Sequence, residues 1–337
     1  MKSFCKKLLI AILTVVSCAT LAIAAACTIT DLDECKHEWD EGTVITESTY
    51  TEAGKIEYTC VKCGEKKTVD LDKKALPIVS PEKTVSAATN EELVSSVKAE
   101  LAGSDSVEFT LGEGSFALKD QSVTTSGKTV VLNGAGKDKT FYMTVYNAEK
   151  GGEYGAEYTF DGAKAVVFKN MTVDFGESNY SGIIRPETII FENCVIKGMI
   201  TYCGSKKAMF VNCEFTVENN YNMWIYANTA MSYEFYGCTF SSKIGKFLHP
   251  YIERGTASLE TVSILVSGCS FGGEKADKAA LNVKAVNNVA WNITIENSTL
   301  GENVSEWYNM AAGVNASSTV TIDGKVVWAN GAKTENN

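Results

Sequence analysis

A six-residue pattern recurs through the second half of the chain and constrains its fold more than any other feature. Each copy reads apolar, polar, Asn or Gly, a small or thiol residue, polar, apolar. Recurrence at a spacing of 19 to 31 residues is typical of stacked coils, in which each supersecondary unit buries its apolar face only against its neighbours. The copies are 168–173, 191–196, 210–215, 235–240, 266–271 and 295–300.

Stacking predicts what each position of the pattern does. Neighbouring coils lie about 4.8 Å apart, so amides at one corner can hydrogen-bond in a ladder. Glycine at the same position indicates a corner that needs a positive φ or little bulk. The corner residues are Asn170, Asn193, Asn212, Gly237, Gly268 and Asn297. The residue after each corner should point inward, which predicts free thiols in the core at Cys194, Cys213, Cys238 and Cys269.

The apolar periodicity predicts one helix followed by many strands. Thr89 and Glu92 form a capping-box pattern, and Leu93, Val97 and Leu101 share one helical face. From residue 107 the apolar period changes from 3.6 to 2, with Gly, Asn, Asp and Ser between the runs. We therefore expect an all-β solenoid whose N-terminal end is closed by the helix at 89–101.

These features together resemble a known superfamily. The helix containing Asn-Glu-Glu-Leu, the segment 107–116 and the repeated Phe-x-Asn-Cys-x-Phe units resemble the right-handed parallel β-helix of pectin-lyase-like proteins, over residues 85–330. The resemblance implies a right-handed solenoid. It implies no single activity, because that fold includes lyases, hydrolases, esterases, phage fibres and non-catalytic surface proteins.

The N-terminus has the pattern of an export signal. Residues 1–26 begin with lysines, continue with an apolar run and end in small residues. Ala24-Ala-Ala-Cys27 resembles a bacterial lipoprotein box with Cys27 as the lipid-bearing residue, although Ala24 stands where Leu or Val is usual. We therefore expect an exported protein anchored at the bacterial cell surface. The alternatives are a box ending at Cys18, cleavage after Ala26 without lipid, and an uncleaved membrane anchor.

Composition argues against nucleic acid as a partner. The chain has 31 Lys+Arg against 41 Asp+Glu, and its only arginines are Arg185 and Arg254. Nucleic-acid binding depends on clustered cations, and recognition of polyanions favours the planar guanidinium group. A hydrophobic content of 45% with only four prolines argues against a disordered chain.

Four potential metal ligands lie in the polar segment 28–72. Cys35 and His37 form a Cys-x-His pair, and Cys60 and Cys63 form a C-x-x-C knuckle followed by glycine. This set suits a tetrahedral structural Zn²⁺, which would stabilise a segment too short to build its own core. The pattern resembles small Cys-x-His…Cys-x-x-Cys ribbon modules of exported bacterial proteins. A disulfide from Cys35 to Cys60 or Cys63 is the alternative.

The predicted organisation follows from these segments. A Pro-containing stretch without periodicity reads as a linker between the ribbon and the β-helix. The predicted order is a signal peptide at 1–26, a zinc-ribbon-like module at 28–72, a linker at 73–84, a β-helix at 85–330 and a tail at 331–337.

The catalytic residues cannot be assigned from the sequence, and three side chains are weak candidates. Asp174, with Glu177 nearby, is the nearest approach to the acidic Ca²⁺ cluster of pectate lyases, although turns commonly carry solvated acids. The Asp-Asp and Gly-His-Gly motifs of polygalacturonases are missing. Strand alternation places His249 and Glu253 on one face, where they could act as acid and base. The alternative for that pair is a strand or loop with a surface salt bridge.

Aromatic residues near His249 are candidates for ligand binding. Trp224 and Tyr226 share one strand face about one coil before Tyr251, and Arg254 follows. Rigid aromatics flanked by amides are typical of sugar recognition, but inward aromatic stacks are equally compatible with this pattern.

We therefore predict a non-catalytic, lipid-anchored surface protein whose β-helix presents a face to glycans or other surface components. The alternative is a polysaccharide lyase or glycoside hydrolase acting near His249 and Glu253. A trimer resembling phage fibres is disfavoured by the lipoprotein box.

Overall fold

The described part of the chain forms two compact units. The computed structural model describes residues 35–118, 124–143, 146–147, 152–153, 155–157, 160–177, 181–183, 186–203, 205–225, 231–251, 255–275 and 277–334. Of these, 35–46 and Lys55–Asp70 form the ribbon, and Glu47–Gly54 and 71–334 form the stacked unit. The predicted signal peptide lies outside the described residues, as do Cys18, Cys27, Tyr226, Glu253 and Arg254. In the part that is described, no helix has the length and apolarity needed to cross a membrane.

The ribbon contains a small sheet with little apolar burial. Its strands are β1 (Thr43–Thr46), β2 (Gly54–Thr59) and β3 (Lys66–Leu71), in the order β1-β2-β3, with β1 antiparallel to β2. Among its described residues Cys60 is the only hydrophobic side chain that is fully buried, whereas Val44 and Ile45 are exposed. Burial alone therefore contributes little to the stability of the ribbon.

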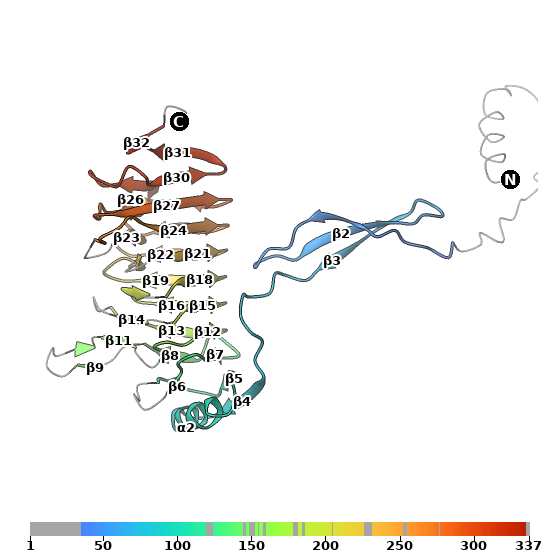
Figure 1. The fold of residues 1–337 in the computed structure, drawn as a ribbon, viewed down its shortest axis with the longest axis horizontal. Coiled ribbons are helices and arrows are strands. Elements are labelled where there is room, and N and C mark those ends of the chain that lie inside the picture. Colours follow the sequence, from blue (N-terminus) through green and yellow to red (C-terminus); the bar gives the residue numbers. More distant parts are fainter. Residues whose placement is uncertain are drawn as a thin grey trace, which may run out of the picture. The chain divides into compact units, whose positions relative to one another are not determined.

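The stacked unit is built mainly from parallel strands, and each strand inside a parallel run pairs with one strand from the coil before and one from the coil after (Figure 1). Sheet A is its largest sheet. In chain order sheet A contains β4 (Lys83–Ala87), β5 (Ser106–Leu111), β7 (Thr129–Asn133), β12 (Ala165–Lys169), β15 (Thr188–Glu192), β18 (Lys207–Val211), β21 (Ser232–Tyr236), β24 (Glu260–Ser267), β27 (Val289–Glu296), β30 (Thr319–Ile322), β31 (Lys325–Ala329) and β32 (Ala332–Lys333).

Two further sheets form other faces of the stack. Sheet B contains β6 (Ser115–Phe116), β8 (Thr140–Tyr142), β13 (Thr172–Asp174), β16 (Val195–Lys197), β19 (Glu214–Val217), β22 (Thr239–Ser242), β25 (Ser270–Gly273) and β28 (Thr299–Leu300). Sheet C contains β20 (Met223–Ile225), β23 (Leu248–Pro250), β26 (Asp277–Val283) and β29 (Val304–Met310). The remaining strands are β9 (Tyr146–Asn147) paired with β10 (Gly152–Glu153), and the sheet of β11 (Gly155–Glu157), β14 (Ser181–Ile183) and β17 (Tyr202–Cys203). The prediction of an all-β fold is confirmed, and the parallel stacking fits a β-solenoid.

The register of sheet A aligns the six-residue copies. The first residue of each copy pairs with the first residue of the next, as in Phe168 with Phe191 and Phe210 with Phe235. Every corner residue has a positive φ, between 49° and 64°. Asn193 Nδ2 donates to Asn170 Oδ1 at 2.8 Å, and Asn170 Nδ2 donates to Asn133 Oδ1 at 3.2 Å. Asparagine thus satisfies both demands of the corner, the left-handed backbone and the amide ladder.

This corner yields a first prediction. Replacing Asn193 with alanine removes the hydrogen bond from its side chain to Asn170. It also forces alanine, which has a Cβ atom but no polar side chain, to adopt a φ of 52°. We expect a loss of about 2 kcal/mol in the free energy of unfolding, against about 1 kcal/mol for Asn193→Gly, which keeps the backbone conformation. Urea unfolding followed by circular dichroism measures both variants. Equal losses would show that the backbone conformation contributes nothing.

The residue after each corner connects two coils inside the stack. Cys194, Cys213, Cys238 and Cys269 are free and buried. Each thiol donates to the carbonyl of the first residue of the preceding copy, at 3.3 to 3.5 Å. Ser298 makes the same bond to Val266, at 3.4 Å. The column therefore consists of small donors that satisfy buried carbonyl groups between coils.

Stacked aromatic rings form two rows in the interior of the stack. Phe191 and Phe210 lie with ring centroids 5.0 Å apart and planes 3° apart, and Phe168 and Phe235 extend the same row. A second row runs from Phe215 through Phe240 to Phe271, with centroid spacings of 4.5 Å. The equal spacing of coils sets this face-to-face arrangement, which places a large apolar area in the core.

The two ends of the stack differ from its middle. The helix α2 (Asn90–Leu101) packs against β4, β5 and β6, burying Leu93, Val97 and Leu101 as predicted. The Thr89 hydroxyl accepts from the Glu92 N–H at 3.2 Å and caps the helix. At the other end β31 runs antiparallel to β30, and β32 runs antiparallel to β31.

The segment between ribbon and stack is partly packed. Leu76 and Ile78, in the predicted linker 73–84, pack on an apolar patch on sheet A. Sheet A begins within that segment, at Lys83, because β4 pairs with β5. The patch consists of Val131, Val167, Ile190, Met209 and Val211.

Candidate metal centre and sheet-face sites

The four predicted metal ligands lie together in the ribbon. One donor atom from each of Cys35, His37, Cys60 and Cys63 lies within 4.8 Å of the other three. Cys35 Sγ lies 4.0 Å from Cys60 Sγ, and Cys63 Sγ lies 3.5 Å from His37 Nδ1. The two sulfurs are too far apart for a disulfide bond, whose length is about 2.05 Å, and all three cysteines are free. The donors are close enough to bind one metal ion.

Backbone geometry brings the two pairs of ligands together. Trp39 forms a bridge with Cys60, and the Val61 N–H donates to Glu38 O at 2.8 Å. The Gly64 N–H donates to Cys60 O at 2.8 Å, and Gly64 has φ 76°, which turns the chain back after the second pair. The knuckle is therefore held by backbone bonds in the absence of an extensive apolar core.

The thiols have unequal proton affinities. Burial by itself raises the pKa of Cys60, but hydrogen bonds from the backbone, that of Cys63 first, and from His37 lower this pKa to about 6. The hydrogen bond with Cys63 is the main reason that the pKa of Cys35 is raised to about 11. Cys60 is therefore a thiolate at neutral pH, whereas Cys35 must lose its proton when a metal ion binds.

Aromatic side chains cover His249 on sheet C. Trp224 pairs with His249 in register, with ring centroids 5.8 Å apart. Tyr251 stacks on His249 at 5.5 Å, and Tyr221, from the turn before β20, stacks on it at 4.4 Å. Trp224, Tyr221 and Tyr251 are half-buried, whereas His249 is 7% exposed. We call these four residues the aromatic cluster.

His249 is neutral in this environment. Its Nδ1 lies 2.7 Å from Asn282 O, so Nδ1 carries the proton and donates it. Burial lowers the pKa of His249 to about 4, and the nearby cations Lys284 and Lys246 act in the same direction. Among the described residues no carboxylate forms an ion pair with it, and the proposed partner Glu253 lies outside them.

Unpaired polar atoms lie beside this cluster. Trp224 Nε1, Thr201 Oγ1 and Asn222 Oδ1 are buried, and none has a hydrogen-bond partner within the described part of the chain. Ile200 and Met223 form a bridge, which places Thr201 beside Trp224 on the neighbouring coil. Sheet C therefore combines ring faces with polar groups whose hydrogen-bonding capacity is unused.

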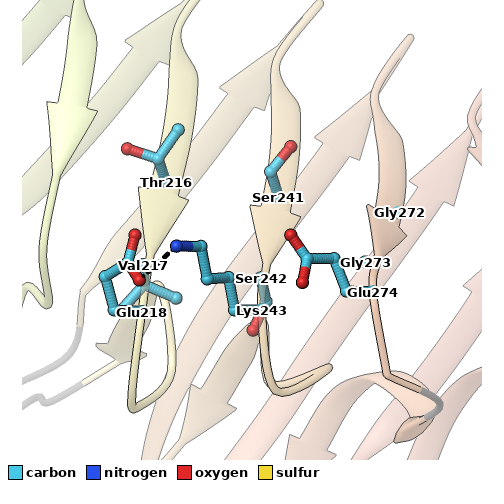
Figure 2. Close-up of a pocket in the computed structure, with 9 residues that line it drawn as sticks. All are labelled: Thr216, Val217, Glu218, Ser241, Ser242, Lys243, Gly272, Gly273 and Glu274. Carbon is cyan, nitrogen blue, oxygen red and sulfur yellow. Dashed lines mark ion pairs between the residues drawn. The ribbon is translucent and has the colours of Figure 1, made fainter.

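A groove crosses sheet B from β13 to β25. Two adjoining cavities of about 440 and 350 Å³ share Thr216, Val217 and Glu218. Figure 2 shows Thr216 and Ser241 on adjacent strands, with Gly272 at the next position. Lys243 reaches toward Glu218, with which it forms an ion pair at 2.5 Å (Figure 2). The small side chains on this face of sheet B leave space for the groove, and charged residues lie at its edges.

The acids Asp174 and Glu177 line the same groove but have local roles. Asp174 Oδ1 accepts from the Gly176 N–H at 2.8 Å, which forms an Asx turn at the end of β13. The Glu177 carboxylate accepts from the backbone N–H groups of Glu218 and Asn219, at 3.2 Å each. Both acids thus stabilise turns. The backbone N–H groups bound by Asp174 differ from those bound by Glu177.

No family model, curated protein or solved structure matched this chain in the comparisons with known proteins.

Sequence reasoning located part of these sites. It placed Trp224, His249 and Tyr251 near one another, and the structure brings them into contact. It missed Tyr221, which lies in a turn where strand alternation gives no information. It also missed the Glu65 carboxylate, whose Oε2 lies 3.5 Å from His37 Nε2. Adjacency to the C-x-x-C knuckle was the available signal for Glu65.

Proposed function

We propose that this chain is an exported, lipid-anchored surface protein whose stacked unit is a right-handed parallel β-helix of the pectin-lyase-like type that binds glycans. The aromatic cluster is the observation that carries the proposal. The partly exposed aromatic side chains on successive coils offer apolar surface to the C–H faces of sugar rings.

The chemistry of His249 favours binding over catalysis. With a pKa of about 4, His249 is a neutral imidazole at neutral pH and has no imidazolium proton to give to a leaving group. Its Nδ1–H is already used in the bond to Asn282 O. Nε2 is therefore the atom left to accept a hydrogen bond from a ligand. Sugar recognition needs such acceptors, whereas lyase or hydrolase chemistry needs an acid–base pair.

The fold assignment is supported by recurring local structure. Parallel sheets related by tight corners with left-handed Asn or Gly, and a helix over the first coil, are the features by which the chain resembles this superfamily. A right-handed path is the hand that connections between parallel strands overwhelmingly take.

The ribbon is proposed to bind a structural Zn²⁺. A tetrahedral ion with bonds of about 2.3 Å to sulfur and about 2.1 Å to nitrogen separates two sulfurs by about 3.8 Å, and sulfur from nitrogen by about 3.6 Å. The spacings of 4.0 and 3.5 Å are close to these values. Three thiolates and one imidazole are a donor set that favours zinc and completes its coordination, so the ion's role is to hold the ribbon together.

Export and anchoring rest on residues 1–26 and Cys27, and the acidic composition supports a partner other than nucleic acid. A lipid on Cys27 would place the chain in the detergent phase of a Triton X-114 separation. Cys27→Ala would move it to the aqueous phase, whereas Cys18→Ala would not.

Glycan binding is tested with variants of the aromatic cluster. The purified protein is presented to immobilised neutral, acidic and amino-sugar polysaccharides, and the tightest oligosaccharide is measured by calorimetry. We expect Trp224→Ala to weaken binding about 10-fold or more, because a lost stacking contact is worth about 1 to 2 kcal/mol. Tyr142→Ala removes a ring that is 37% exposed on sheet B and should leave affinity unchanged.

Two results would contradict this proposal. Equal affinity in wild type and Trp224→Ala would remove the aromatic cluster from glycan recognition. Release of reducing ends or unsaturated products from any of these polysaccharides, abolished by His249→Ala, would instead identify an enzyme.

A further inference from the structure

We propose that His37 binds the metal ion through Nδ1 and that Glu65 is a positioning residue that fixes this choice of nitrogen. This inference rests on the proposed metal site. It goes further by assigning the liganding atom and a role for a residue outside the ligand set. The distances around the His37 ring carry it.

The two ring nitrogens of His37 face different partners. Nδ1 lies 3.5 Å from Cys63 Sγ, within the cluster of donors. Nε2 lies 3.5 Å from Glu65 Oε2, on the other side of the ring. A neutral imidazole has one N–H and one lone pair, so a carboxylate beside Nε2 favours the tautomer with its proton there. The lone pair is then on Nδ1, where the metal ion would bind.

Two further contacts restrict the plane of the ring. The Trp39 indole stacks on His37 with ring centroids 5.0 Å apart and planes 22° apart. Lys67 Nζ lies 4.3 Å from the centre of the Trp39 ring, on which it makes a cation–π contact. Stacking limits tilting of the imidazole but does not distinguish the two flipped orientations. The contact with Glu65 is the one that does.

The backbone places Glu65 for this role. Cys60 N–H donates to Glu65 O at 2.7 Å, so Glu65 is tied to the same loop that carries two ligands. Gly64, with φ 76°, directs the chain back across the knuckle immediately before it. The loop that carries Cys60 and Cys63 therefore also places the Glu65 carboxylate beside His37. Carboxylates that accept from a liganding histidine typically contribute 10- to 100-fold in metal affinity.

The nitrogen assignment is tested by NMR of the full chain, because the chain contains only two histidines. The protein is labelled with ¹⁵N-histidine and loaded with ¹¹³Cd²⁺. We expect a one-bond cadmium coupling on His37 Nδ1 and a protonated Nε2. His249, whose Nδ1 donates to Asn282 O, serves as an uncoupled internal reference. A coupling on Nε2 would overturn the assignment.

The role of Glu65 is tested by affinity for Co²⁺ in a competition assay with a chelator. We expect Glu65→Gln to weaken binding about 10-fold, at the lower end of the usual range, because the Glu65 side chain is 62% exposed. Its cadmium spectrum should also show exchange between the two nitrogens. Glu65→Asp should recover part of the loss. Glu38→Gln removes a carboxylate that is paired with Lys62 at 3.1 Å and is the matched control for charge.

The outcomes separate this inference from the metal proposal. Failure of the wild type to bind Co²⁺ or Cd²⁺ would overturn both. Wild-type binding with equal losses in Glu65→Gln and Glu38→Gln would show a general charge effect and overturn only the positioning role. Unchanged affinity and an unchanged cadmium spectrum in Glu65→Gln would also overturn only the positioning role of Glu65.

Discussion

We expect Cys60→Ser to abolish metal binding by the ribbon and to unfold residues 35–46 and 55–70, while the stacked unit remains folded. Cys60 is the one fully buried hydrophobic side chain among the described ribbon residues, and hydrogen bonds lower the pKa of its thiol to about 6. Structural zinc contributes about 10 to 16 kcal/mol of apparent binding free energy in small modules, which is far more than this ribbon gains from apolar burial. We expect zinc analysis to fall from about one ion per chain to none.

Limited proteolysis and metal analysis check this result. Cleavage should become fast within the ribbon and stay slow in the stacked unit. A chelator should reproduce the effect in the wild type. Val61→Ser alters a side chain that is 65% exposed in the same loop and should keep both the metal and the resistance to protease. A ribbon that stays resistant without metal would contradict the structural role of the ion.

Gly198→Ala is expected to destabilise the stacked unit by about 3 kcal/mol or more. Gly198 has φ 77°, and a Cβ atom at this position would lie 1.9 Å from Gly176 O and 2.5 Å from Gly176 C. These are backbone atoms of the preceding coil, so no flexible side chain can move aside. The Gly198 N–H also donates to Thr216 O at 2.9 Å, which fixes it to the following coil. Relief of the clash must therefore separate coils.

Urea unfolding monitored by near-ultraviolet circular dichroism measures this loss. Gly272→Ala is the matched control, because an added Cβ there meets nothing within 4 Å. The control should remain within about 0.5 kcal/mol of the wild type. A Gly198→Ala variant as stable as Gly272→Ala would mean that the two coils are not in the close contact described above.

The stack could be predicted from sequence because one local pattern determines it. The Asn or Gly at each corner specifies the backbone conformation, and the next residue, such as Cys213, specifies a small inward donor. These requirements are the same in every coil, so they appear as a repeat. The capping helix could be predicted for the same reason, because the residues that signal its start, Thr89 and Glu92, lie within one turn of it.

The aromatic cluster was only partly accessible in this way. Alternation along β23 placed His249 relative to Tyr251, but contact with Tyr221 depends on how a turn of one coil lies over a strand of the next. The tautomer of His249 depends on a carbonyl 33 residues away, that of Asn282, which accepts from Nδ1. No sequence pattern specifies such a pairing before the register is known.

The groove on sheet B was missed for a related reason. Its floor combines Thr216, Ser241 and Gly272, which are ordinary small residues when each strand is read alone. They form a hollow only because the register places them side by side. In the ribbon, by contrast, the spacing of Cys35, His37, Cys60 and Cys63 was sufficient to predict that their donor atoms lie together.

The antiparallel pairing of β31 with β30 limits how two molecules can associate. At this end of sheet A the last strands alternate in direction. The first strand of a second copy, β4, pairs in parallel within its own sheet, so the strand directions at the two ends differ. The antiparallel β31 and β32 at one end and α2, packed on β4, β5 and β6 at the other, are features expected to work against head-to-tail growth into filaments, to which open parallel stacks are prone.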